Sequence, residues 1–204
     1  MAGKFITFEG GEGSGKTTQI KLLQKQLNDA GKKSVLTREP GGCAPADAIR
    51  KLLLTGSVDK WHPVAETLLF QAARVEHVER VIKPALERGE IVICDRFLDS
   101  TIVYQGIAKG LGVEYIKQLH QFTLGSFAPD LTLILDIEPE IGLKRAHARA
   151  GDETRFENME LEFHRNVRNG FLKLAHENPP RYKIINADQS VKDVHKSILE
   201  AVNL

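Results

Sequence analysis

Short apolar runs rich in β-branched residues recur along the chain and alternate with longer stretches of helical periodicity. The runs cover residues 5–8, 34–37, 91–94, 131–135 and 182–185. Two of them, Ile91-Val92-Ile93 and Leu133-Ile134-Leu135, lack the polar alternation of a strand that has one face in water. Strands that are buried on both sides and separated by helices are typical of parallel sheets. The pattern therefore predicts an α/β fold with about five parallel strands and helices on both faces.

The stretches of helical periodicity have recognisable ends. They cover residues 17–27, 46–54 and 63–88, and two more begin near residues 140 and 158. Gly31 suits the left-handed position after the first helix. Pro84 lies inside the long region 63–88, where we expect it to bend the helix. The length of this region indicates that part of its apolar surface faces something besides the sheet, and either a partner helix or packing within the core explains this surface.

Length and composition are those of an ordinary globular protein. The chain has 204 residues, of which 42% are hydrophobic and 27% are charged, so one domain over 1–204 is predicted. The net charge of +1 gives no reason to expect a nucleic acid or an anionic membrane as partner. Neither a signal peptide nor a membrane span is recognisable, so we expect a cytoplasmic protein. The two cysteines lack the spacing of a zinc site.

A glycine-rich segment follows the first predicted strand. It reads Gly10-Gly11-Glu12-Gly13-Ser14-Gly15-Lys16-Thr17 and fits GxxxxGK(S/T), between a strand and a helix as the motif requires. Glycines allow successive backbone N–H groups to converge on phosphate oxygens at a helix N-terminus. In such a P-loop, Lys16 would reach the β- and γ-phosphates of ATP and Thr17 would hold Mg²⁺. The sequence thus predicts a P-loop NTPase fold.

Charged residues follow two other predicted strands. Asp95 and Arg96 come directly after the run 91–94, and Arg38 begins a polar turn after 34–37. Ligands of open α/β sheets gather at the carboxyl ends of the strands. There Asp95 could orient Mg²⁺ opposite Thr17, and Arg96 could hold an acceptor phosphate. An ion pair that closes the strand end is the alternative interpretation of Asp95 and Arg96.

The segment 144–157 differs from the rest of the chain. It interleaves basic residues with Ala, Gly and Asp between two predicted helices, and little in it could fill a core. Such a composition is typical of a mobile lid that excludes water during phosphoryl transfer. A solvated basic helix end followed by a loop is the alternative.

Two absent features exclude some classes of P-loop protein. The chain has no Asn-Lys-x-Asp guanine motif and is short for a ring-forming ATPase, which leaves a small-molecule kinase. Arginines on separate elements would neutralise two phosphorylated substrates that repel each other. Two alternatives stay open: a nucleoside monophosphate kinase for another base, and a nucleotide-dependent switch that signals to a protein partner.

Several motifs together resemble the thymidylate kinase family over most of the chain. They are Phe8-Glu9-Gly10, Thr37-Arg38-Glu39-Pro40-Gly41-Gly42, Leu69-Phe70 with Ala73-Arg74, Asp95-Arg96-Phe97, Asp99-Ser100-Thr101 with Tyr104-Gln105-Gly106, and the arginine-bearing lid. The resemblance implies a five-stranded sheet, a homodimer, and phosphorylation of dTMP to dTDP with ATP and Mg²⁺ in dTTP biosynthesis.

The resemblance also implies roles that spacing alone does not assign. Glu12 would reach the sugar 3′-hydroxyl of dTMP, and Arg38 and Arg96 would hold its phosphate. Phe70 would stack on thymine and Arg74 would donate to its O4. The remaining contacts would come from Thr101 and Gln105 near the polar edge of the base and from Tyr104 against the 2′ position.

The family divides by where it keeps the arginine that stabilises the transition state. After Glu12 the P-loop has Gly13, which carries no charge. The chain therefore resembles the bacterial type, in which the lid supplies this cation. Arg149 is the first choice for it, and Arg145 and Arg155 are the alternatives.

Overall fold

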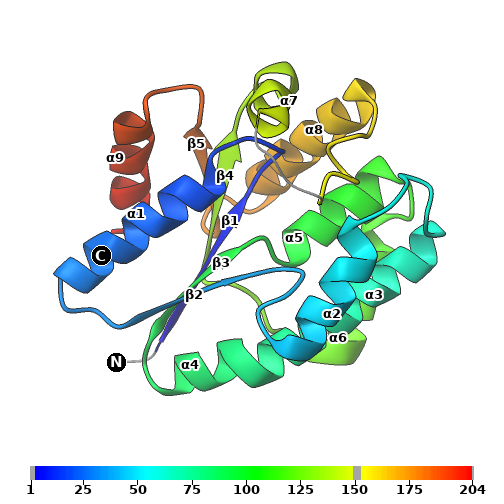
Figure 1. Cartoon of the computed structure of the whole chain (residues 1–204). Coiled ribbons are helices and arrows are strands. Elements are labelled where there is room, and N and C mark those ends of the chain that lie inside the picture. The colour runs from blue at the N-terminus through cyan, green and yellow to red at the C-terminus, as the bar shows by residue number, and fades with distance from the viewer. Residues whose placement is uncertain (1–2, 149–152, 204) are drawn as a thin grey trace.

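The protein is built on a five-stranded parallel sheet. The computed structural model describes residues 3–148 and 153–203. The strands are β1 (Lys4–Glu9), β2 (Ser34–Arg38), β3 (Ile91–Asp95), β4 (Leu131–Asp136) and β5 (Tyr182–Asn186). Their spatial order is β2-β3-β1-β4-β5, and every neighbouring pair is parallel (Figure 1). Each predicted apolar run lies inside one of these strands, so the predicted sheet is confirmed.

Helices cover both faces of the sheet. They are α1 (Lys16–Asp29), α2 (Ala44–Leu54), α3 (Pro63–His77), α4 (Lys83–Glu87), α5 (Leu98–Thr101), α6 (Val113–Leu124), α7 (Pro139–His147), α8 (Leu161–Glu177) and α9 (Val191–Val202). Figure 1 shows α1 and α9 together on one side of the strands and α3, α4 and α6 on the other. No described helix is long and apolar enough to span a bilayer.

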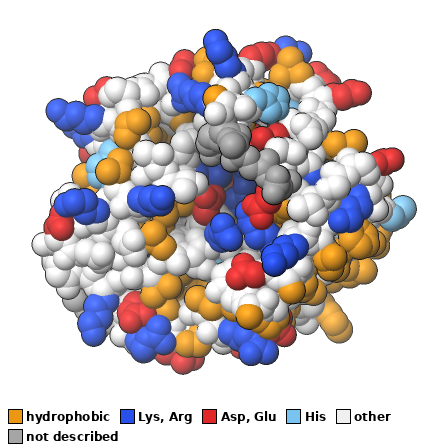
Figure 2. All heavy atoms as spheres, viewed as in Figure 1, with side chains coloured by type: hydrophobic (Ala, Val, Ile, Leu, Met, Phe, Trp, Pro, Cys, Tyr) orange, Lys and Arg blue, Asp and Glu red, His pale blue; other side chains and the backbone are white. Residues whose placement is uncertain are grey.

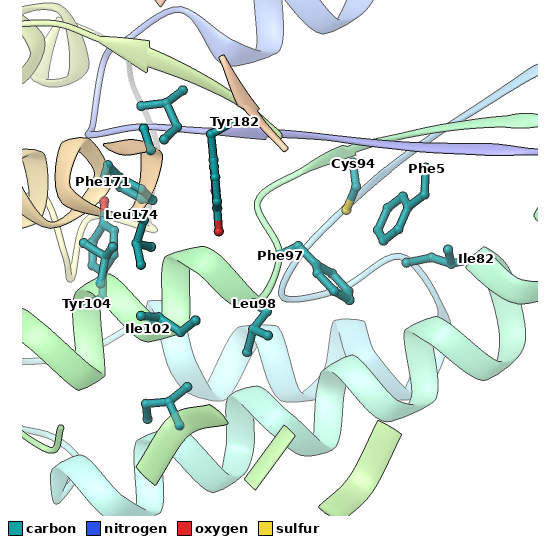
Figure 3. Packing of buried hydrophobic residues seen from close by; sticks show 14 of the residues in the cluster. Phe5, Ile82, Cys94, Phe97, Leu98, Ile102, Tyr104, Phe171, Leu174 and Tyr182 are labelled. Atoms are coloured by element: carbon teal, nitrogen blue, oxygen red, sulfur yellow. The ribbon is translucent and has the colours of Figure 1, made fainter. Parts of the chain in front are cut away.

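Two apolar cores form because successive strand residues point to opposite faces. On one face, Ile6 and Phe8 of β1 pack with residues of α1 and α9. On the other face, Phe5 packs with Phe97 and with residues of α4, α6 and α8. Figure 3 shows part of this second core, where Phe5, Phe97 and Ile82 lie together. Both faces are thus buried, which explains the missing polar alternation.

One π-helical turn interrupts a predicted helix, and a second lies where no helix is predicted. The region 63–88 consists of α3, the π-helical turn η1 (Val78–Ile82) and α4. The Lys83 N–H bonds to the Val78 carbonyl, five residues back, just before Pro84. Because proline has no N–H and crowds the preceding turn, this wider turn admits Pro84 without ending the helix. A second π-helical turn, η2 (Ile102–Ala108), follows α5.

The helix predicted to begin near residue 158 begins at Leu161 instead. Residues 154–159 form turns, in which the Asn158 N–H bonds to the Thr154 carbonyl and the Met159 N–H to the Phe156 carbonyl. Leu98–Ala108 is also helical, although the sequence predicts no helix there. These turns and this helix both border the site described next.

Candidate active site

A cavity of about 710 Å³ lies where β1, β2 and β3 end. Its walls come from the P-loop, the turn after β2, α3, the segment after β3, η2 and residues 153–157. Figure 2 shows basic and acidic side chains gathered in a hollow near the centre of this face. The position is that expected for ligands of an open α/β sheet.

The P-loop wraps around the side chain of Lys16. Its ammonium group donates to the carbonyls of Gly10 at 3.1 Å and Gly11 at 2.9 Å and to the Ser14 hydroxyl at 3.2 Å. Burial and the neighbouring Arg96 lower the pKa of Lys16 to about 8. Lys16 therefore remains largely charged at neutral pH, as a phosphate ligand must.

The first helical turn of α1 adjoins the end of β3. The Thr17 hydroxyl donates to the Asp95 carboxylate at 3.2 Å. A hydroxyl and a carboxylate beside a P-loop are the oxygen ligands that Mg²⁺ takes together with substrate phosphates and water. The predicted pair is thus together in space, and its chemistry fits Mg²⁺.

Arg96 lies at the centre of the cavity. Its guanidinium donates to the Gly10 carbonyl at 3.0 Å, to Ser100 Oγ at 3.2 Å and to Glu12 Oε1 at 2.9 Å. It also lies 5.2 Å from the centre of the Tyr104 ring. The backbone of Arg96 has φ of 69°, a region that costs free energy for a residue with a side chain. Such strain persists where neighbouring contacts enforce it, and it is common at functional sites.

Glu12 is held as an anion by the groups around it. It accepts from Arg96 and, at 2.9 Å, from the Tyr104 hydroxyl. Burial alone would raise the pKa of Glu12, but Arg96, Lys16 and the Tyr104 hydrogen bond outweigh it and lower the pKa to about 2. Glu12 is therefore an acceptor throughout the physiological range, which a contact with a hydroxyl donor needs.

Glu9, the last residue of β1, contacts the residues that follow Arg96, a role that sequence reasoning missed. Its carboxyl accepts from the Phe97 N–H at 2.7 Å and from the Ser100 hydroxyl at 2.6 Å, so it fixes the segment that follows Arg96 to the end of β1. Glu9 is fully buried. Burial and the nearby Asp99 carboxylate raise the pKa of Glu9 to about 8. The sequence offered two signals, a carboxylate at the end of an apolar strand and the motif Phe8-Glu9-Gly10 of the family resemblance, but neither assigned Glu9 a role.

Arg74 lies at the far end of the cavity, nearly fully buried at 2% exposure. It donates to Glu39 at 2.8 Å, to Gln71 at 2.9 Å and to the Thr101 hydroxyl at 2.8 Å. These contacts use three of its five N–H donors. Glu39 also contacts His77 Nδ1 at 3.0 Å, so the carboxylate fixes Arg74 within a buried network. Sequence reasoning missed this role of Glu39.

Phe70 and Gln105 line the same end of the cavity as Arg74. The Phe70 ring centre lies 6.1 Å from that of Phe156. Gln105 donates its amide nitrogen to Glu66 at 2.8 Å, which leaves the amide oxygen as the end that can accept from a ligand. Arg38 ends β2 opposite Asp95 and also lines the cavity, with its side chain exposed. All the predicted substrate-binding residues thus border one cavity.

The three candidate arginines of the lid have different positions. Arg149, the first choice, lies outside the described residues. Arg145 on α7 donates to the Ala187 carbonyl and to Asp188, both at 3.2 Å. Arg155 is 1% exposed and donates to backbone carbonyls of the segment 53–58. The contacts of Arg145 and Arg155 therefore engage their guanidinium groups with protein partners.

Comparisons with known proteins agree with this geometry. The family model for thymidylate kinase matches residues 8–198. A thymidylate kinase of Caulobacter vibrioides is 49% identical over 200 residues, covering 98% of this chain and 96% of that protein. Another, from Magnetococcus marinus, is 48% identical over 202 residues, with coverage of 99% and 96%. The crystal structure of thymidylate kinase from Ehrlichia chaffeensis matches with a TM-score of 0.81 and 35% identity, over 99% of this chain and 100% of that one. The chain therefore belongs to the thymidylate kinase family, the kinases that phosphorylate dTMP to dTDP with ATP and Mg²⁺.

Proposed function

We propose that the cavity transfers the γ-phosphoryl group of ATP to the 5′-phosphate of dTMP, giving ADP and dTDP. The observation that carries the proposal is the position of Arg96. Its guanidinium bonds to the P-loop carbonyl of Gly10 and also faces Tyr104 on the acceptor side. One cation thus borders both substrate sites, where two mutually repelling phosphates need neutralisation.

The donor half of the site consists of the P-loop and the end of β3. Lys16 binds the β- and γ-phosphates, and the backbone N–H groups of residues 10–17 surround them. Thr17 and Asp95 hold Mg²⁺, which supplies positive charge to the phosphate oxygens. Their hydrogen bond at 3.2 Å supports this assignment, because it brings both oxygen ligands to one point.

The acceptor half selects dTMP. Arg38 and Arg96 bind its phosphate and Glu12 accepts from its 3′-hydroxyl. Phe70 stacks on the base, and Tyr104 occupies the space that a 2′-hydroxyl would need.

Hydrogen bonds choose thymine over cytosine. Arg74 has two N–H donors left for O4, Thr101 lies beside it, and the Gln105 amide oxygen can accept from N3–H. Cytosine would place an amino donor against Arg74 and an unprotonated nitrogen against Gln105, which costs about 1 to 3 kcal/mol for each unpaired group.

Arg149 supplies the cation of the transition state. The P-loop position after Glu12 does not supply it, because Gly13 has no side chain and a Cβ atom there would lie 1.9 Å from the Gly142 carbonyl oxygen. A side chain at Gly13 would therefore displace α7. Arg145 and Arg155 both donate to protein oxygens, so Arg149 stays the first choice among the lid arginines. Replacing Arg149 with alanine should lower kcat about 10³-fold or more with little change in either KM. Wild-type turnover would contradict the assignment.

The acceptor specificity tests the proposed function. ADP formation is measured with dTMP, dUMP, CMP, AMP and GMP at equal concentrations. We expect dTMP to give the highest kcat/KM, and dUMP to be about 10- to 100-fold poorer because it lacks one methyl group. A purine nucleotide as the best acceptor would point to a kinase for another base. Turnover of ATP that no nucleotide accelerates would point to a switch.

We also propose a homodimer built on α3 and α6. Three apolar side chains on these helices are exposed: Leu68 (49%), Tyr115 (39%) and Phe122 (90%). Such side chains are common in interfaces between subunits. The single-domain organisation and a cytoplasmic location stay predictions.

A further inference from the structure

Arg155 and Glu66 form an ion pair in the interior of the protein. The guanidinium lies 2.5 Å from Glu66 Oε2, and the two side chains are 1% and 0% exposed. Arg155 also donates to the carbonyls of Leu53, Ser57 and Val58, at 3.2, 2.9 and 2.9 Å. Pairing and hydrogen bonding on this scale are what a buried charge requires. Arg155 thus ties the segment 153–157 to α3 and to the end of α2.

A second contact fixes the same segment to α2. Glu153 accepts from two nitrogens of Arg50, at 2.8 and 2.6 Å. Arg50 in turn donates to the Pro40 carbonyl at 2.8 Å. Two arginine–carboxylate pairs therefore hold the residues on both sides of Thr154.

Phe156 follows Arg155 directly and lines the same cavity as Phe70 and Tyr104. Its ring centre lies 6.1 Å from that of Phe70 at an interplanar angle of 54°, and 5.7 Å from that of Tyr104 at 82°. Lys109 and Arg155 both lie over the ring, at 5.2 and 5.1 Å from its centre. Phe156 is therefore held in one orientation by aromatic and cationic neighbours.

We propose that Phe156 is a specificity-determining wall of the base pocket, and that Arg155, paired with Glu66, is the positioning residue that sets it. The proposal rests on the proposed function, in which thymine stacks on Phe70. The Phe156 ring lies 6.1 Å from the Phe70 ring and is inclined to it. Phe156 therefore closes the pocket at the side of the base and does not stack on the base. Glu66 also links this wall to the residue that faces the polar edge of the base. The same carboxylate accepts a hydrogen bond from Gln105 at 2.8 Å and one from Lys109 at 2.7 Å.

The test uses Phe156→Ala, Arg155→Lys and the double variant. Arg165→Ala serves as control, since Arg165 is an exposed arginine that pairs with Glu140 on the surface. Steady-state kinetics are measured with dTMP varied at saturating ATP and with ATP varied at saturating dTMP. Thermal melts of each variant check that it is folded. Wild-type turnover of dTMP tests the proposed function separately, because it does not depend on any variant.

We expect Phe156→Ala to raise the KM for dTMP about tenfold or more, with kcat and the KM for ATP within about threefold of wild type. Arg155→Lys should raise the same KM, and should add little in the Phe156→Ala background because it acts through the ring. The control should match wild type. A wild-type KM for dTMP in Phe156→Ala would overturn the proposal. An Arg155→Lys change that raises the KM for dTMP equally in the wild-type and Phe156→Ala backgrounds would also overturn it. So would an Arg155→Lys change that lowers kcat and leaves this KM unchanged.

Discussion

Ionisation of Glu9 should make the free energy of unfolding depend on pH. The variant Glu9→Gln keeps the shape of the protonated carboxyl group but cannot ionise. In the folded protein, burial and the Asp99 carboxylate raise the pKa of Glu9 from 4.5 to about 8. Between these values the folded chain retains a proton that the unfolded chain releases. The stability that Glu9 contributes is therefore fully present below pH 4.5 and is lost as the pH rises through about 8.

The size of the effect follows from the two pKa values. While the proton numbers differ by one, the free energy of unfolding falls by about 1.4 kcal/mol for each pH unit. The interval from 4.5 to about 8 covers about 3.5 units, so the whole loss is of the order of 5 kcal/mol. Glu9→Gln lacks this loss. Its free energy of unfolding relative to wild type should rise by roughly 2 to 3 kcal/mol between pH 6 and pH 8.

Urea unfolding of both proteins at half-unit steps from pH 5 to pH 9 measures this difference. Titrating groups that do not interact with Glu9 are common to the two chains, so their contributions cancel in the comparison. Glu87→Gln, a change at an exposed glutamate on α4, is the matched control and should follow wild type throughout. Parallel curves for wild type and Glu9→Gln would refute the reasoning, since they would mean that Glu9 is already ionised in the folded protein at pH 6.

Three further predictions concern the donor site, the base pocket and the subunit interface. Asp95→Asn should raise the Mg²⁺ concentration needed for half-maximal rate by about tenfold or more in a Mg²⁺ titration, and an unchanged titration would remove Asp95 from the metal site. Phe70→Ala should raise the KM for dTMP by about tenfold or more and leave the KM for ATP unchanged, and equal effects on both would indicate a general loss of structure. Phe122→Glu should produce monomers in sedimentation equilibrium, because it puts a charge at a residue that is 90% exposed in the single chain and buried in the proposed dimer, and a wild-type mass would place the interface elsewhere.

Local patterns in the sequence were sufficient to predict the sheet and the position in it of the residues of the proposed donor site. The strand β3 illustrates why. Its run Ile91-Val92-Ile93 indicates a strand buried on both faces. Asp95 and Arg96 follow this run, so they lie at the carboxyl edge of the sheet, where ligands bind. The P-loop was equally predictable, because its chemistry depends on a fixed spacing within eight residues. Such features depend on neighbours in the chain and not on the tertiary structure.

The supporting carboxylates could not be predicted in the same way. Glu39 and Glu66 look like surface residues in the sequence, yet they are 5% and 0% exposed. Their burial depends on partners far along the chain, Arg74 for Glu39 and Arg155 for Glu66. Without the fold there was no sign of these pairs. Arg155 was for this reason considered as a catalytic cation, although its contacts anchor the chain.

The π-helical turns could not be predicted from the sequence either. In η2 the wider turn lies within the stretch that supplies Tyr104 and Gln105 to the cavity. Its side-chain pattern follows neither the period of 3.6 nor that of 2, so periodicity does not reveal it. The family resemblance named these residues as binding residues without indicating the backbone that presents them.

The central claim is that arginine cations hold the phosphates of the two substrates close to each other, while the Phe70 ring selects the pyrimidine base. A crystal structure of the protein with dTMP tests it most directly. The account predicts the thymine ring stacked on Phe70 with O4 toward Arg74, and the phosphate bound to Arg38 and Arg96. A structure that holds dTMP away from both Phe70 and Arg96 would contradict it.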